Sequence, residues 1–272
     1  MPICLVGPLN VALRQVGLGK MDGALENLER SIISFENQRM VRQREAELFN
    51  AQLAGSYLLK GVILSARSSR ANAETRRHDA LEAEKHLDLA LKTQPNDTEA
   101  LFYRAINSSY LGNVPSALDD YNRVIGHLRT KSDDRVTSEL LARSYFGAAQ
   151  LWWEVNRKGK ARDRARDAID ALPASLSESE EAGEMHKFLG EVREVLRPGP
   201  LAIRSTSTAI RILEPITSER ARRLTMEAKQ TLERLRLVQA NTSITQIDEG
   251  AEESDSTDDD LNPPHQSAHP PQ

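Results

Sequence analysis

One pattern of side chains recurs along this chain at helical spacing, and it restricts the fold more than any other feature of the sequence. Ala83, Leu87 and Ala90 stand four and three residues apart, and Ala117 begins a second copy 34 residues after Ala83. Positions with this spacing lie on one face of an α-helix. A face that recurs at a period of this length predicts a stack of helical units, in which each unit buries its face against the next.

Turn signals between the copies predict that each unit is a pair of antiparallel helices. In the clearest unit, a first helix ends before Gly112 and Asn113, and a second helix carries Ala117, Tyr121 and Val124. Glycine and asparagine are typical of such turns. No run of alternating β-branched residues requires a strand, so the expected class is all-α. The pattern gives five units at approximately 5–40, 46–97, 98–130, 138–175 and 182–215.

Small residues should mark the point where the two helices of each unit cross, because antiparallel helices approach closely only where side chains are small. The expected crossing residues in the five first helices are Ala12, Ala54, Ala105, Ala149 and Gly190. The second-helix face recurs outside the two clearest copies as Ala24, Leu28 and Ser31, as Ala161, Ala165 and Ala168, and as Ala202, Thr206 and Ala209.

With these residues at this spacing, the chain resembles the tetratricopeptide repeat (TPR) family, and the repeat domain is expected at residues 1–240. The resemblance implies a right-handed α-solenoid whose first helices line a concave groove. Two departures from the family are visible. The second helices of the first two units are 59 residues apart and those of the third and fourth are 44 apart, so insertions are expected, the larger at 66–78 as an extended helix end or a loop. Gly7 and Pro8 are expected to interrupt the first helix.

The C-terminal region divides into an amphipathic segment and an acidic one. Residues 218–239 predict a capping helix that covers the last unit. Its apolar stripe consists of Ala221, Leu224, Ala228, Leu232, Leu235 and Val238. The alternative use of this stripe is a coiled coil or partner helix, through which the chain would oligomerise. Residues 248–272 contain eight acids and no Lys or Arg, which predicts a disordered tail at 241–272.

Several functional classes are disfavoured by what the sequence lacks. One cysteine, Cys4, cannot supply a disulfide framework within the chain, and the six histidines have no ligand spacing, so neither a metal nor a cofactor is expected. Residues 17–21 lack the first glycine and the Ser or Thr of a phosphate loop, and no catalytic signature is present. No apolar run approaches the ~20 residues of a membrane span, and no signal peptide is recognisable. A non-enzymatic protein of the cytoplasm or nucleus is therefore expected.

The aromatic residues indicate where a partner would bind. Eight of twelve lie between residues 102 and 153. Helical phase assigns Tyr121, Tyr145 and Trp152 to the core. The residues that the TPR resemblance places on or near the concave face are Phe102, Ile106, Tyr110, Arg143, Phe146, Gln150 and Trp153. Trp, Tyr and Arg are frequent among interface hot spots. The expected function is an adaptor that binds a peptide or helix of a partner protein, although an inserted loop or neighbouring repeat covering these side chains is the alternative.

The sequence disfavours two other classes of partner, a chaperone carboxyl terminus and a nucleic acid. Co-chaperones of the TPR family bind the terminal carboxylate of heat-shock chaperones through Lys and Asn of their first helices, but here Arg143 is the only basic candidate, which disfavours this role. Residues 157–166 contain six bases and one acid, as a nucleic-acid-associated scaffold would, yet no aromatic is interleaved, so a solvated helix face is favoured. A third use of the charge is an acidic tail that folds back over a basic helix.

Overall fold

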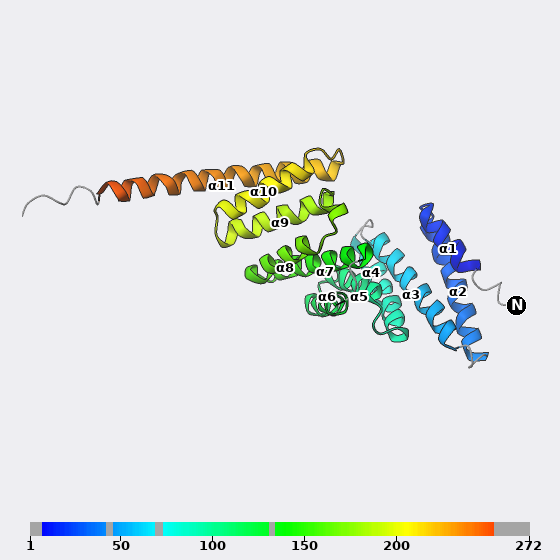
Figure 1. Cartoon of the computed structure of the whole chain (residues 1–272). Helices are drawn as coiled ribbons and strands as arrows, with labels where there is room; N and C mark the ends of the chain where they lie inside the picture. The colour runs from blue at the N-terminus through cyan, green and yellow to red at the C-terminus, as the bar shows by residue number, and fades with distance from the viewer. Residues whose placement is uncertain (1–6, 42–45, 69–72, 131–133, 253–272) are drawn as a thin grey trace, which may run out of the picture.

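The computed structural model describes residues 7–41, 46–68, 73–130 and 134–252, and nearly all of them are helical. Each helix packs mainly against the helices just before and after it, which gives a solenoid of five antiparallel pairs followed by one long helix (Figure 1). The helices are α1 (Gly7–Gly17), α2 (Met21–Val41), α3 (Ala46–Ser68), α4 (Ala73–Thr93), α5 (Thr98–Tyr110), α6 (Val114–Leu128), α7 (Arg135–Glu154), α8 (Lys158–Ala171), α9 (Glu180–Leu196), α10 (Pro200–Leu213) and α11 (Glu219–Glu252), with a 3-10 turn at Ala174–Leu176. The fold is the expected all-α, TPR-like solenoid.

The helix boundaries in the centre of the chain follow from local capping. The Asp97 side chain accepts hydrogen bonds from the backbone N–H groups of Glu99 and Ala100 at 3.0 and 3.1 Å, which satisfies donors that the first turn of α5 leaves unpaired. Gly112 has a φ of +77°, a conformation that glycine adopts without strain, and Asn113 then caps α6. The turn expected at Gly112 and Asn113 is therefore confirmed.

The small residues expected at the helix crossings are buried without exception. Ala12, Ala54, Ala105 and Ala149 have no exposed surface, and a Cβ on Gly190 would lie 2.4 Å from Oγ1 of Thr206. The alanines of the second-helix faces are equally buried. Close contact of helix backbones at these points is what holds each pair together.

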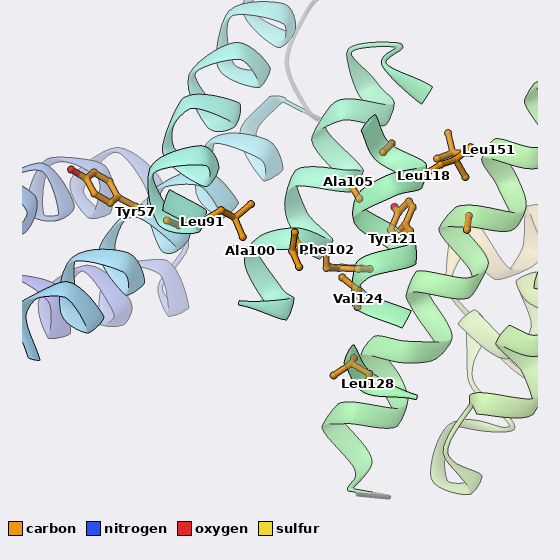
Figure 2. Packing of buried hydrophobic residues seen from close by; sticks show 14 of the residues in the cluster. Tyr57, Leu91, Ala100, Phe102, Ala105, Leu118, Tyr121, Val124, Leu128 and Leu151 are labelled. Carbon is orange, nitrogen blue, oxygen red and sulfur yellow. The ribbon is translucent and has the colours of Figure 1, made fainter. Parts of the chain in front are cut away.

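The largest core cluster lies in the middle of the solenoid and joins helices α2 to α7. It contains Phe35, Tyr57, Leu101, Tyr121 and Leu151, which come from five different helices. Figure 2 shows part of this cluster, with Phe102 and Ala105 of α5 beside the Tyr121 and Val124 side chains of α6. This packing positions the face on which the candidate site lies.

Two boundaries differ from the sequence-based expectation, and a third follows one of its two alternatives, an extended helix end. Helix α1 begins at Gly7, so Gly7 and Pro8 start the helix and do not interrupt it, since proline is tolerated in a first helical turn. The insertion at 66–78 lengthens α3 and α4 on either side of residues 69–72, which lie outside the described residues.

The second difference concerns the C-terminal helix. It was expected to end at residue 239, with the tail beginning at 241, but α11 continues to Glu252 and extends beyond the ends of α9 and α10 (Figure 1). Once a helix is formed, each further residue adds a hydrogen bond at little cost, and no proline follows before Pro263. Residues 253–272 of the expected tail lie outside the described residues.

The first part of α11 covers the last helical pair, as expected of a cap. Ala221, Ala228 and Leu235 are buried, and Leu224 is 7% exposed. Val238, the last residue of the expected stripe, is 44% exposed, so the covered surface ends near Leu235. None of the described helices combines the length and the apolar run that crossing a bilayer needs.

Two arginines tie neighbouring helices together, a feature that sequence analysis did not identify. Arg104 of α5 binds Asp120 of α6 through Nε and Nη2, both at 2.7 Å, and its Nη1 donates to Asp88 of α4 at 2.7 Å. Arg67 of α3 binds Asp79 of α4 in the same two-pronged manner at 2.7 Å. Paired hydrogen bonds of this kind fix the orientation of both side chains.

Candidate protein-binding groove

A groove of about 470 Å³ lies along the first helices of the third, fourth and fifth pairs and reaches the start of α11. It is lined by Phe102, Tyr103, Ile106, Ser109 and Tyr110 of α5, Tyr121 of α6, Arg143, Phe146, Gly147 and Gln150 of α7, Glu181, Glu184 and Met185 of α9, and Arg220 of α11. Most of these side chains come from α5, α7, α9 and α11. They form one surface because the first helices of successive pairs lie next to one another, and α11 continues this order.

Six of the seven residues predicted for the concave face line this groove together. Trp153 does not line it. Its ring lies edge-on to Phe188 with centroids 5.9 Å apart, and Phe188 in turn contacts Phe146 at 5.6 Å. Lys158 Nζ lies 3.2 Å from the Trp153 ring centroid on this side. Trp153 thus supports the α7 end of the groove through Phe188.

The α5 side of the groove is an aromatic surface that ranges from buried to exposed. Phe102 is only 7% exposed, and its ring packs edge-on against Tyr103 and Tyr121, with centroids 5.4 and 6.1 Å apart. Tyr110, one helical turn beyond Ile106, is 57% exposed. Phe102 therefore belongs to both the core and the groove wall, whereas Tyr110 offers most of its ring to a ligand.

A glycine gives the groove its depth between α6 and α7. A Cβ on Gly147 would lie 2.4 Å from Cζ and 2.5 Å from Oη of Tyr121, much closer than side chains approach. The end of the Tyr121 ring therefore occupies the space above the α7 backbone. Glycine inside a helix costs about 1 kcal/mol relative to alanine, so its presence here is explained by this contact.

The charged residues of the groove are paired with one another. Arg143 Nε lies 2.8 Å from Glu181 Oε1, and its Nη2 lies 2.7 Å from Glu139 Oε1. Partial burial lowers the pKa of Arg143, but the hydrogen bond that Arg143 donates to Glu181 and the charges of both carboxylates outweigh this effect and raise it. Arg220 similarly pairs with Glu184 at 2.6 Å. A charged ligand would have to displace these carboxylates, whereas an apolar one would not.

Burial also changes the acidity of a tyrosine in the groove. The pKa of Tyr103 is raised, first by burial and then by the negative charge of Glu99, while the positive charge of Arg143 acts in the opposite direction. Tyr103 is therefore a neutral hydrogen-bond donor and acceptor at physiological pH. Among the described residues, no group of three or more His, Cys, Asp or Glu side chains is arranged to hold a metal.

Sequence analysis missed the residues that α9 and α11 bring to the groove. Glu181 lies in the first turn of α9, and Arg220 lies within the predicted capping helix at 218–239. Helical phase shows which residues share a face of one helix, but it does not give the rotation between successive pairs, which decides whether α9 and α11 face Tyr103 and Phe146. Gly147, in the interior of an expected helix, was the one signal available.

Comparison with known proteins identifies the fold. No family model matches the sequence, and no curated protein matches it. Among solved structures, a MamA RS-1 ArsTM double mutant is similar with a TM-score of 0.56 at 15% identity, over 80% of this chain and 99% of that one. MamA residues 41 to the end, from Desulfovibrio magneticus RS-1, gives a TM-score of 0.54 at 15% identity over the same shares. The apo form of RapI gives 0.56 at 15% identity, over 94% of this chain and 77% of that one. At this identity the likeness shows the fold alone.

Proposed function

We propose that this protein is a non-enzymatic adaptor that binds an apolar segment of a partner protein in the groove between α5, α7 and α9. The observation that carries the proposal is the coexistence of an exposed aromatic surface with charges that are already paired. Tyr110 of α5 and Gln150 of α7 are exposed in the groove, while Arg143 is bound by Glu139 and Glu181. Such a groove gains most from covering apolar surface.

The rigid support of the groove favours tight recognition of such a segment. Phe102 packs edge-on against Tyr103 and Tyr121 within the groove wall, and Phe146 packs edge-on against Phe188, which does not line the groove. A surface whose side chains are fixed before binding loses little conformational entropy when a peptide docks. Recognition of a helix or an extended segment by apolar anchors in a groove is a common mode of peptide binding.

The pairing of Arg143 also supports this ligand over a terminal carboxylate. A carboxylate-binding co-chaperone needs cations that are available to the ligand, and Arg143 has two acceptors within 3 Å. Replacing Glu181 by a ligand carboxylate would exchange one ion pair for another with little net gain. The proposed partner is therefore an apolar segment rather than an acidic chain end.

The test is quantitative affinity purification from the native cell extract with a double variant, Tyr110→Ser and Gln150→Glu. Both side chains are exposed, so the variant should fold like the parent protein, which circular dichroism and melting temperature would verify. We expect the main protein partners to be lost from this variant. The partners lost from the variant should then be tested by calorimetry as purified segments.

A matched control changes exposed apolar residues away from the groove. Val136→Ser with Leu201→Ser replaces side chains that are 68% and 63% exposed and that do not line the groove. This control should keep the partners. If both variants retain them, or both lose them, the groove is not the binding site and the proposal fails.

A further inference from the structure

A cluster of three arginines lies outside the groove, where α8, α9 and α10 meet, and we refer to it as the basic edge: Arg162 and Arg166 of α8 and Arg193 of α9. Helix α9 packs against both α8 and α10. The two α8 arginines flank Ala165, which packs against Leu189 of α9, and Arg193 lies one turn beyond Leu189. The three guanidinium groups are therefore brought to one side of the molecule by the packing of α8 on α9.

The basic edge is poor in negative charge. Arg193 is half-buried and donates from Nη1 to Ser205 Oγ at 2.6 Å and to the Leu201 carbonyl at 3.3 Å, which are neutral acceptors. In the part of the chain that the structure describes, no carboxylate lies within ion-pair distance of Arg193 or Arg166, and Arg162 pairs only with its neighbour Asp163. This differs from the groove, where each arginine has its carboxylate.

The electrostatics of Arg193 agree with this geometry. Burial lowers the pKa of Arg193 first, and the positive charges of Arg162 and Arg166 lower it further. The charges therefore repel one another across the α8–α9 contact. An anion placed between them would relieve that repulsion, as anions do at clusters of arginine elsewhere in proteins.

We propose that the basic edge is an anion-binding site and that the acidic segment 253–272 of this same chain is its ligand. The segment contains five acids and no Lys or Arg, so its charge is opposite to that of the site. The helix that precedes it passes near the site. Arg234 of α11 pairs with Glu194 at 3.0 Å, and Glu194 is adjacent to Arg193, so α11 passes the basic edge before it continues to Glu252.

The lengths of helix and segment allow this contact. From Arg234 to Glu252 the helix advances about 27 Å at 1.5 Å per residue. A random coil of twenty residues has a root-mean-square end-to-end distance of about 25 Å and spans at most about 66 Å. A tether whose natural length matches the distance to be spanned gives an effective concentration in the millimolar range. Several weak ion pairs can then act together, although each alone contributes little.

The test measures where the segment lies in the full-length protein. A nitroxide label is attached to the cysteine of a Ser256→Cys variant in which Cys4→Ser removes the native thiol, and broadening of backbone amide signals is recorded by NMR. We expect broadening at residues 158–166 and 193–204 at about 0.02 M salt, and its loss at about 0.5 M, where the screening length is only a few ångströms.

Charge-removing variants decide whether the basic edge is the site. Arg162→Gln with Arg166→Gln changes two exposed side chains and should abolish the broadening, as should Asp258→Asn with Asp259→Asn and Asp260→Asn in the segment itself. The matched control, Arg222→Gln with Arg223→Gln, removes the same charge from the exposed face of α11 and should leave it unchanged.

Three results would overturn the proposal. They are absence of broadening at low salt, equal sensitivity to the control pair, and broadening that arises only between molecules in a mixture of labelled and isotope-enriched chains. The last result would assign the site to the segment of a second copy. None of these results depends on the groove, so the proposal stands or fails separately from the proposed function.

Discussion

Small side chains decide where the helices of this protein touch, and most of these contacts could be predicted from the sequence. Ala12, Ala54, Ala105 and Ala149 were expected at helix crossings from spacing alone, and all four have no exposed surface. The role of Gly147 could not be predicted in the same way, because it depends on where the ring of Tyr121 ends. A repeating pattern identifies the residues that every unit needs, whereas a contact formed by one pair alone requires the three-dimensional structure.

Replacing Gly147 by alanine should therefore destabilise the protein. The new methyl group would overlap Tyr121, which is buried and cannot move freely, so we expect the free energy of unfolding to fall by about 1–3 kcal/mol. The control is Gly126→Ala in α6, where a Cβ would meet nothing within 4 Å. That change should stabilise the protein by up to about 1 kcal/mol. Urea unfolding of both variants measures the difference, and equal effects would contradict our account of Gly147.

At the scale of helices, the order and pairing were predictable, but their ends and their ionic ties were not. The length of α11 differs from expectation, and the sequence does not decide between the two alternatives for the ends of α3 and α4, because polar segments such as 66–78 are compatible with either a helix or a loop until neighbouring charges are placed. Arg67 illustrates the point. It lies in this segment and binds Asp79 of α4, and neither residue belongs to the repeating pattern.

This tie should make stability depend on pH. The hydrogen bond from Arg67 lowers the pKa of Asp79 in the folded protein, against the opposing effect of burial. A lowered folded-state pKa stabilises the fold above the unfolded-state value of about 4, and this contribution is lost as the pH falls through the folded-state pKa. We expect Asp79→Asn to reduce the free energy of unfolding by about 2 kcal/mol at pH 7 and by much less at pH 2.

Denaturant unfolding at the two pH values measures this effect. Asp22→Asn serves as the control, because Asp22 is 93% exposed and lies 3.3 Å from the same arginine. Exposed ion pairs contribute little, so this variant should resemble the parent protein at both pH values. A loss for Asp79→Asn that is the same at pH 7 and pH 2 would show that the ion pair is not its cause.

For the whole molecule, contacts between neighbouring helices imply that the two ends of the solenoid are only indirectly coupled. The helices that pack closely are neighbours or next neighbours in the chain, and separate core clusters lie at α1–α3 and at α10–α11. The groove reflects the same arrangement. Its α5 and α7 residues could be predicted from helical phase, but those of α9 and α11 depend on the rotation accumulated from one pair to the next.

Local destabilisation should therefore remain local. Leu213→Ala creates a cavity in α10 that should cost about 2–5 kcal/mol, and in such an array the loss falls mainly on the adjacent helices. Hydrogen exchange measured by mass spectrometry should become faster in α9–α11 and stay unchanged in α1–α4. Leu28→Ala in α2, another buried leucine, should give the reverse pattern. Uniformly faster exchange along the chain in either variant would show a single cooperative unit.

The same sequence of neighbour contacts also makes the molecule mechanically compliant. Around the groove, helices of successive pairs contact each other less than the two helices of one pair do, so we expect the solenoid to bend first at the junctions α5–α7, α7–α9 and α9–α11, which the groove crosses. Small rotations at these junctions add along the groove and change the distance between the Tyr110 wall and Arg220. Tension or torque applied to α11 would be transmitted to the groove as a change in its width, so its affinity for a ligand would respond to mechanical load.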